Sequence, residues 1–221
     1  MHWVLRFYSS SVGKKIVMAA TGVILFGFII GHLIGNLQIF AGPEVLDSYA
    51  RFLKEKPEVI WTARVTLLAS VGLHILPATQ LTMRNRPPPP IASQLHKYDE
   101  ASYASRTMVW SGPIIGLFVI YHLLHFTVGT VHSSHPDFRA EAVYANVVSG
   151  FQQWPVALFY IVAVLSLGLH MAHGVWSMFQ SIGLNHPKYE PLIRRSAVVL
   201  SSLIVAGYVS IPLAVLVGVV R

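Results

Sequence analysis

The chain has 221 residues, of which 54% are hydrophobic and only 11% carry a charged side chain. Soluble domains usually carry about 25% charged residues, so this composition favours a membrane protein. Cysteine is absent, which excludes disulfides and cysteine-ligated iron–sulfur clusters in this chain. We attribute the net charge of +7 to membrane topology and not to nucleic acid binding, because no basic run with interleaved aromatic residues stands outside the apolar stretches.

Long uncharged runs dominate the sequence, and each is long enough to cross a membrane, which takes about 20 mostly apolar residues. Backbone polar groups in lipid must be satisfied within the segment, so the predicted class is all-α. We expect one transmembrane domain over residues 1–221. The first run is too long for a signal-peptide core and should remain as a helix. The five predicted helices cover residues 14–40, 60–83, 107–131, 155–181 and 196–220.

Polar segments flank these helices. Residues 1–15 form a predicted amphipathic segment at the membrane interface, and Ser9–Ser11 are predicted to cap the helix that follows. Residues 84–106 are either a docking surface or a solvated linker, and residues 182–195 are a predicted loop. Lys and Arg number ten on the side that holds these three segments and six on the other side. The N-terminus is therefore predicted to be cytoplasmic, in the inner membrane of a bacterial cell.

Four apolar stretches contain a histidine, and they form two pairs of near-copies. The second and fourth share the phrase Ser-x-Gly-Leu-His, at residues 70–74 and 166–170. The first and third share a longer pattern at identical spacing, with Thr21 and Ser111 as matching hydroxyl residues. Its copies are Gly22, Phe28, Ile30, His32 and Leu33, against Gly112, Phe118, Ile120, His122 and Leu123.

Depth in the membrane pairs the histidines in the same way. At about 1.5 Å rise per residue, His32 and His122 both lie about 25 Å above the cytoplasmic boundary. His74 and His170 lie on helices of opposite direction and fall nearer the cytoplasm. Helices one apart in the sequence can face each other diagonally in a bundle. The pattern therefore predicts an outer and an inner pair of imidazoles, each clamping one haem iron, an arrangement that favours electron transfer.

Other interpretations compete with the two haems. A single buried histidine can form an interhelical hydrogen bond, and zinc sites in helices usually recruit carboxylate or cysteine ligands, which the apolar stretches lack. His125 and His173 each follow a repeat histidine by one turn and are expected to bond a propionate, a quinone or a backbone carbonyl. Gly27, Gly31 and Gly35 form a stripe suited to helix packing or to clearance beside a flat macrocycle. The remaining histidines are predicted surface residues: His2, His96, His132, His135 and His186.

Three sequence phrases resemble a known family, the diheme cytochrome b membrane anchors of type B succinate dehydrogenase and fumarate reductase (respiratory complex II). They are Ser11–Lys15, Gly31–Asn36, and Phe159–Val162 leading to His170 and Gly174–Ser177. The resemblance implies a partner flavoprotein with FAD that oxidises succinate, and a partner iron–sulfur subunit on the cytoplasmic side. It implies two haems b and a membrane quinone, usually menaquinone, as acceptor. The chain alone is not expected to be an enzyme.

The sequence departs from some of these relatives in one respect. A glutamate that they carry two residues before the fourth ligand, proposed to carry protons, is Gly168 here. Quinone candidates near the outer haem are Gln38, Arg51 and Trp61. Ser11, Lys15 and Arg106 are candidates for contacts with propionates or a quinone near the inner haem, and each of the six is otherwise an ordinary interfacial anchor.

Two alternatives to the complex II anchor follow from the same residues. The chain is alternatively a diheme cytochrome b of another quinone-linked dehydrogenase, such as a hydrogenase or formate dehydrogenase. A haem-free membrane scaffold or transporter is the third hypothesis, although the lack of an intramembrane acid or lysine speaks against an ion-coupled transporter.

Overall fold

The computed structural model describes residues 2–84, 103–132, 138–184 and 186–221, leaving out the side chains of residues 103–106. Every regular element in these ranges is helical. Five helices are long and apolar enough to cross a membrane, as predicted. Their bounds are α2 Ser11–Leu37, α4 Pro57–Arg84, α6 Tyr103–His122, α8 Trp154–Ser181 and α9 Glu190–Leu216.

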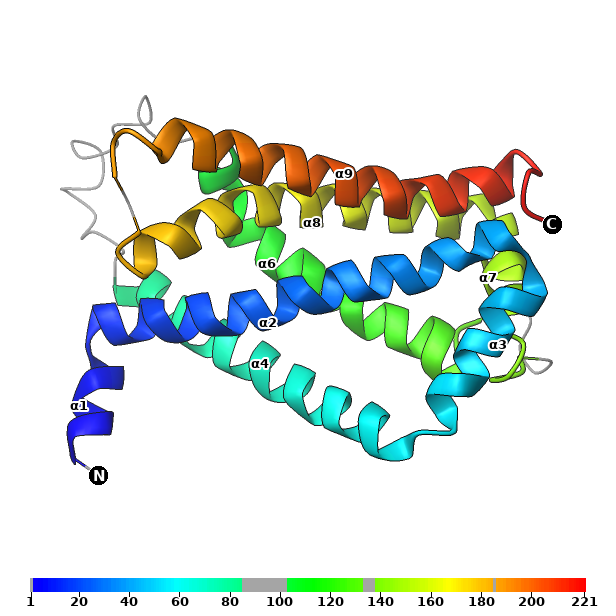
Figure 1. Cartoon of the computed structure of the whole chain (residues 1–221), viewed down its shortest axis with the longest axis horizontal. Coiled ribbons are helices and arrows are strands. Elements are labelled where there is room, and N and C mark those ends of the chain that lie inside the picture. The colour runs from blue at the N-terminus through cyan, green and yellow to red at the C-terminus, as the bar shows by residue number, and fades with distance from the viewer. Residues whose placement is uncertain (1, 85–102, 133–137, 185) are drawn as a thin grey trace.

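The five long helices alternate in direction and form one elongated bundle (Figure 1). α2 packs against α4 and α8, and α8 packs against α6 and α9. Within the described helices, neither α2 and α6 nor α4 and α8 form an extended contact with each other, so the members of each of these two pairs lie across the bundle from one another. This is the diagonal arrangement on which the pairing of the histidines depends.

Short helices lie at the two ends of the bundle. At one end, α1 (His2–Ser9) precedes α2, and Ser10 caps α2 by accepting a hydrogen bond from Gly13 N at 2.9 Å. Lys14 is buried and donates to the backbone carbonyls of Tyr8 and Ser9 at 3.1 and 3.3 Å. We call this the inner end. The predicted amphipathic segment and its serine cap are thus present as an ordered helix and an N-cap.

The opposite, outer end holds two helices that the sequence analysis treated as loops, α3 (Pro43–Lys54) and α7 (Val143–Gln152). α3 has proline in its first turn with Glu44, and Arg51 and Lys54 in its last turn, the charge order that a helix dipole favours. Together with the short η1 (Gln38–Ala41) and the ends of α8 and α9, these helices enclose a buried apolar cluster that includes Ile39, Leu46 and Phe151.

Several helix ends differ from the sequence-based bounds by three residues or more, and two of them have a clear local cause. α9 begins at Glu190 and not near residue 196, because Pro191 fits its first turn and Arg194 bonds Glu190 Oε1 at 2.8 Å. Arg194 and Arg195 therefore lie in a helix and not in a loop. α6 continues into a π-helical segment, η3 (Leu123–Val128), which ends at Gly129 with a φ of +82°. The glycine tolerates this left-handed conformation, which stops the helix before residue 131.

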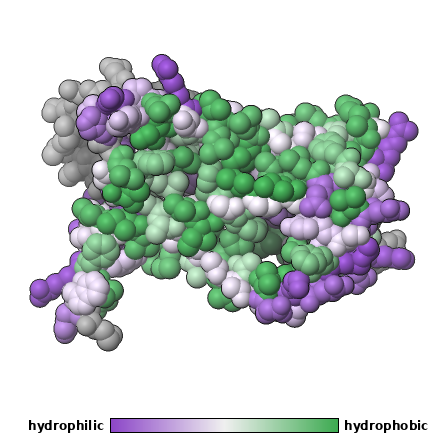
Figure 2. All heavy atoms as spheres, viewed as in Figure 1, coloured by the Kyte–Doolittle hydropathy of each residue, from purple (hydrophilic) through white to green (hydrophobic). Residues whose placement is uncertain are grey.

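Large apolar side chains cover the outside of the bundle. In Figure 2 the middle of the visible face is mostly hydrophobic, and hydrophilic residues gather towards its two ends. Trp110, Leu117 and Leu203 are 73%, 69% and 65% exposed. An apolar belt of this kind is typical of a protein surface that faces lipid.

Candidate functional site

The bundle brings the four repeat histidines together in the predicted pairs. The rings of His74 on α4 and His170 on α8, here called the inner pair, have centroids 6.3 Å apart and planes at 56°. The rings of His32 on α2 and His122 on α6, the outer pair, have centroids 5.9 Å apart and planes at 81°. In each pair, the two spanning helices are separated in the sequence by one other spanning helix.

These separations suit a metal ion between two imidazoles. A bond from a metal to an imidazole nitrogen is about 2 Å long, so two rings on opposite sides of one ion have centroids about 6 Å apart. Among the described residues, no three His, Cys, Asp or Glu side chains gather around a common point. Each site therefore offers two protein ligands. Two ligands suit a haem iron, which the porphyrin also binds, better than they suit a tetrahedral metal ion held by protein side chains alone.

Space for a flat macrocycle exists beside the outer pair. A Cβ atom added at Gly27 or Gly31 would meet nothing within 4 Å, whereas one at Gly35 would lie 2.9 Å from the Tyr49 ring. The glycine stripe of α2 therefore supports close packing only at Gly35. At Gly31, next to His32, it leaves room. The residues present thus fit a haem group at this level.

The inner pair is surrounded by hydroxyl groups. Thr21 Oγ1 lies 3.2 Å from His74 Nδ1, and Ser111 Oγ lies 3.2 Å from His170 Nδ1. Met18 O also lies 3.1 Å from His74 Nδ1. Both hydroxyl groups come from the helices that carry the outer pair.

Aromatic rings surround the outer pair. Phe28 stacks on His32 with centroids 5.3 Å apart and planes at 14°. The hydroxyl of Tyr160, from α8, lies 3.5 Å from His122 Nδ1 and 2.9 Å from His125 Nδ1. The Tyr160 hydroxyl therefore lies near two histidines, His122 at the end of α6 and His125 in η3.

The two neighbouring histidines lie close to the pairs but make different contacts. His125 is fully buried, and its Nε2 has no hydrogen-bond partner among the described residues. His173 Nδ1 and Trp176 Nε1 are likewise buried without a partner in the described chain, and the Arg194 guanidinium lies 3.9 Å from the centroid of Trp176. The end of α8 near the inner pair thus presents two unpaired N–H or nitrogen groups beside a cation.

His132 corrects the sequence-based assignment of a surface histidine. Its side chain is only 4% exposed, its Nε2–H donates to Asn146 O at 2.8 Å, and its ring stacks on His125 with centroids 4.8 Å apart. The fold of α7 over η3 encloses this residue, which no helical periodicity could indicate. His2 and His186 are exposed as predicted, whereas His96 and His135 lie outside the described residues.

Gly168 lies where α8 packs against α9, two residues before His170. A Cβ atom at this position would lie 2.4 Å from Val205 Cγ2. The packing of α9 therefore excludes a side chain here, and with it a carboxylate of the kind that some diheme anchors carry.

The remaining candidate residues make no hydrogen bond to the histidine pairs. Arg51 is exposed and donates to Ser48 Oγ at 2.9 Å. Trp61 is 60% exposed beneath the Arg64 guanidinium at 5.1 Å, and Gln38 is half-buried in η1. At the inner end, Ser11 and Lys15 are exposed. The side chain of Arg106, and most of the predicted docking segment 84–106, lie outside the described residues.

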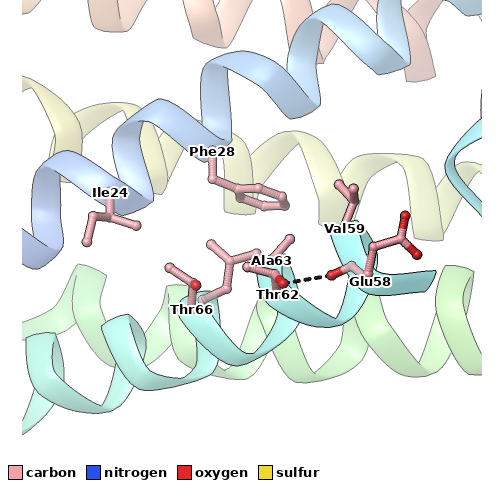
Figure 3. Close-up of a pocket in the computed structure, with 8 residues that line it drawn as sticks. Ile24, Phe28, Glu58, Val59, Thr62, Ala63 and Thr66 are labelled. Atoms are coloured by element: carbon pink, nitrogen blue, oxygen red, sulfur yellow. Dashed lines mark hydrogen bonds between the residues drawn. The ribbon is translucent and has the colours of Figure 1, made fainter. Parts of the chain in front are cut away.

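A cavity that opens widely to the outside, and that the sequence did not indicate, lies between α2 and α4 towards the outer end. It has a volume of about 500 Å³ and an almost wholly apolar lining, and most of its lining residues are exposed. Figure 3 shows Phe28 pointing from α2 towards the α4 side chains, and Thr62 donating to Glu58 O at 2.7 Å. Because Phe28 also stacks on His32, one side chain joins the cavity to the outer pair. The lining residues are Ile24, Phe28, Glu58, Val59, Thr62, Ala63, Thr66 and Leu67.

Comparison with known proteins gives one match. The family model described as succinate dehydrogenase/fumarate reductase transmembrane subunit matches residues 82–211, a range that includes α6, α8 and most of α9. No curated protein and no solved structure matches the chain. The matched range contains His122 and His170, one member of each pair.

Proposed function

The chain belongs to the family of succinate dehydrogenase and fumarate reductase transmembrane subunits, and we propose that it is the two-haem electron-transfer anchor of such a complex. In this proposal His74 and His170 hold an inner haem b, and His32 and His122 hold an outer one. An iron–sulfur subunit, itself reduced by an FAD flavoprotein, docks at the inner end, which faces the cytoplasm. A membrane quinone, menaquinone in the expected case, is the electron acceptor.

One observation carries the proposal, the approach of four histidines from four helices as two facing pairs. Ring centroids at 5.9 and 6.3 Å match the separation that bis-imidazole ligation requires. A single buried histidine can serve many roles, such as an interhelical hydrogen bond. Two facing pairs at two levels of one bundle are compatible with far fewer roles. Bound haem would supply one-electron chemistry, and holding it with two histidines would favour electron transfer over oxygen binding.

The protein positions the histidine rings and excludes water from the two proposed haem sites. The histidines sit on long helices, whose backbone fixes each ring more precisely than a loop does. Thr21 and Ser111 orient the inner rings, and Phe28 stacks against one outer ring. The apolar belt of the bundle keeps both sites away from bulk water. None of these residues forms a site for a dicarboxylate, so succinate oxidation belongs to the flavoprotein partner.

The quinone binds in the cavity between α2 and α4. Its volume of about 500 Å³ and its apolar lining suit a lipid-soluble ring. Glu58 and Thr62 offer polar atoms at its outer edge, and Phe28 separates it from His32 by a single stacked ring. Trp61 lies on the same stretch of α4 as these residues. Gln38 and Arg51 remain candidates for contacts of the head group at the outer end.

Groups at the inner end of α8 suit the carboxylates of the inner haem. His173 Nδ1 and Trp176 Nε1 lack partners among the described residues, and the Arg194 guanidinium lies against the Trp176 ring. A propionate would satisfy both buried nitrogen groups and pair with the arginine, which removes the cost of leaving them unpaired. Lys15, Ser11 and Arg106 are further candidates, and His125 is the corresponding candidate near the outer haem.

The test is purification of the complex through a tag on this chain. We expect a flavoprotein and an iron–sulfur protein to co-purify, and succinate to reduce cytochrome b absorption bands in the product. Recovery of a hydrogenase or formate dehydrogenase, with reduction by hydrogen or formate and none by succinate, would overturn the assignment in favour of another quinone-linked dehydrogenase. Succinate oxidation by a complex without haem bands would leave the chain as a haem-free anchor.

A further inference from the structure

The two inner histidines have equivalent hydroxyl partners on neighbouring helices. Thr21 Oγ1 and Ser111 Oγ each lie 3.2 Å from the Nδ1 atom of their histidine, His74 and His170. Both hydroxyl side chains are nearly inaccessible, with Thr21 6% and Ser111 4% exposed. Contacts of this length between buried groups act in a low dielectric, where a hydrogen bond is stronger than in water.

The carbonyl groups nearby decide where the proton lies. Met18 O is 3.1 Å from His74 Nδ1, and a carbonyl oxygen can only accept. His74 Nδ1 therefore carries the proton. Thr21 Oγ1 donates its own hydrogen to Val17 O at 2.8 Å, so its oxygen is free to accept from the same Nδ1–H. In a neutral imidazole the lone pair is then on Nε2, which is the nitrogen left available to a metal.

The second site repeats the hydroxyl contact, although no carbonyl oxygen of the described residues bonds His170 Nδ1. Ser111 Oγ donates to Met108 O at 3.3 Å and can accept from His170 Nδ1–H. Thr21 also lies 3.1 Å from Met18 O, which is the equivalent carbonyl. The positions of Met18 and Thr21 precede His32 by the same spacings as those of Met108 and Ser111 precede His122. The repeat in α2 and α6 therefore supplies a histidine to the outer pair and a hydroxyl to the inner pair.

The outer histidines lack an equivalent pair of partners. The Tyr160 hydroxyl is 3.5 Å from His122 Nδ1 but only 2.9 Å from His125 Nδ1, and a phenol has one hydrogen to donate. Within the described residues, no side chain forms a hydrogen bond with the His32 ring. The hydroxyl contacts at Nδ1 are therefore a property of the inner pair, and a carbonyl that fixes the ring tautomer is present at His74.

We propose that Thr21 and Ser111 are positioning residues of the inner haem, an inference that rests on the proposed function. Each accepts the Nδ1–H of an axial histidine, fixes the tautomer that leaves Nε2 free, and sets the rotation of the ring. Donation from Nδ1 makes the other ring nitrogen a more basic ligand, which favours ferric over ferrous iron. The two hydroxyl groups together lower the midpoint potential of the inner haem and leave that of the outer haem unchanged.

The experiment is a redox titration of the purified complex, monitored at the cytochrome b bands, with electron paramagnetic resonance of the oxidised haems. Thr21→Val and Ser111→Ala remove the hydroxyl groups with little change of volume. We expect each to raise the inner potential and shift its resonance signal, with the outer signals unchanged. Thr21→Ser keeps the hydroxyl and should restore the wild-type potential. In the double variant we expect the inner haem content to fall about tenfold or more.

Matched controls are available on other helices. Thr79 Oγ1 donates to Ile75 O at 3.0 Å and Ser166 Oγ to Val162 O at 3.0 Å, each without a histidine contact. Thr79→Val and Ser166→Ala should leave both potentials unchanged. If Thr21→Val fails to accumulate in the membrane, Ser111→Ala alone decides the matter, because it deletes one atom.

The outcomes separate this inference from the proposed function. A wild-type complex with two haems whose potentials are indifferent to both substitutions overturns the positioning role and leaves the two-haem anchor intact. Equal shifts at both haems, or equal shifts in the control variants, also overturn it, because they indicate a general change of the bundle. A wild-type complex without haem overturns both proposals.

Discussion

The inner and outer histidine pairs each come from a repeated sequence, a different one for each pair, and they lie in different surroundings. The inner rings contact hydroxyl groups of two neighbouring helices at 3.2 Å. The outer rings lie among Phe28, Phe118 and a phenol that is shared with a third histidine. A repeat therefore fixes which residues meet, whereas the surrounding helices decide how firmly each ring is held and what lies next to it.

This difference suits two tasks. The inner pair lies towards the end where the partner subunits dock in our proposal, and Met18 O holds the His74 ring in one tautomer. The outer pair lies beside the cavity of about 500 Å³, where the proposed quinone would enter and leave. A site that exchanges substrate benefits from apolar contacts that adapt, while a site that only relays electrons benefits from fixed geometry.

The largest expected effect comes from filling the space beside the outer pair. Gly31→Leu places a side chain next to His32 where a Cβ meets nothing within 4 Å. We expect the protein to fold and insert normally but to lose the outer haem, which halves the haem bound per chain while the inner haem stays. The assay is haem content per chain with reduced-minus-oxidised spectra. Val23→Leu, at a position of α2 that is 59% exposed, is the control for expression. Retention of both haems in Gly31→Leu would show that the space serves another purpose.

Tyr160→Phe should affect the outer pair more than the inner one. The change removes the hydroxyl that lies 2.9 Å from His125 Nδ1 and leaves that nitrogen buried without a partner. A lost partner of this kind costs about 1–3 kcal/mol of stability. We expect a lower thermal unfolding temperature and a shifted potential of the outer haem alone, measured by thermal denaturation and redox titration. Tyr189→Phe, on an exposed side chain, is the control.

Thr66→Leu should impair only the use of quinone. The added volume enters the cavity between α2 and α4, where Thr66 is a lining residue. We expect the KM for quinone to rise about tenfold, which corresponds to about 1.4 kcal/mol of binding free energy, while both haems remain bound. Steady-state assays with a range of quinone concentrations measure this. Thr79→Leu, on the same helix but outside the cavity, should leave the KM unchanged. Equal effects of the two changes would show that the quinone does not bind in this cavity.

The smallest effect is expected at the inner end. Glu190→Gln removes the carboxylate that pairs with Arg194 at 2.8 Å, between side chains that are 31% and 48% exposed. Such surface pairs contribute about 0–1 kcal/mol. We expect a small change in unfolding temperature and unchanged binding of both haems, because the arginine still lies against Trp176. Loss of the inner haem in this variant would mean that Glu190, and not the indole, holds the guanidinium in place.

The sequence was sufficient to predict the five spanning helices and the partners of His32 and His74. Hydropathy marks the spans, and the residue counts from the membrane boundaries set the depth of each histidine. Depth and helix order together then allow one pairing of the histidines, His32 with His122 and His74 with His170. The serine cap of α2 and the first turn of α8 also followed from local sequence rules.

Other features depend on how the helices rotate and diverge, which periodicity does not encode. The contact of Thr21 with His74 requires a rotation of α2 against α4, so the hydroxyl repeat was visible in the sequence while its purpose was not. The burial of His132 depends on α7, a helix in a segment predicted as a loop. The cavity exists because α4 runs obliquely to α2 (Figure 1), an angle set by tertiary packing.

The pairing of the histidines is tested most directly by haem analysis of four single variants, His32→Ala, His74→Ala, His122→Ala and His170→Ala, in the purified complex. A pyridine haemochrome assay counts the haems, and reduced-minus-oxidised spectra distinguish them. We expect two haems b per wild-type chain. His32→Ala and His122→Ala should lose the same haem, and His74→Ala and His170→Ala should lose the other. Exposed His186→Ala should lose neither. Loss of one common haem from His32→Ala and His74→Ala, or haem content indifferent to all four changes, would contradict this pairing.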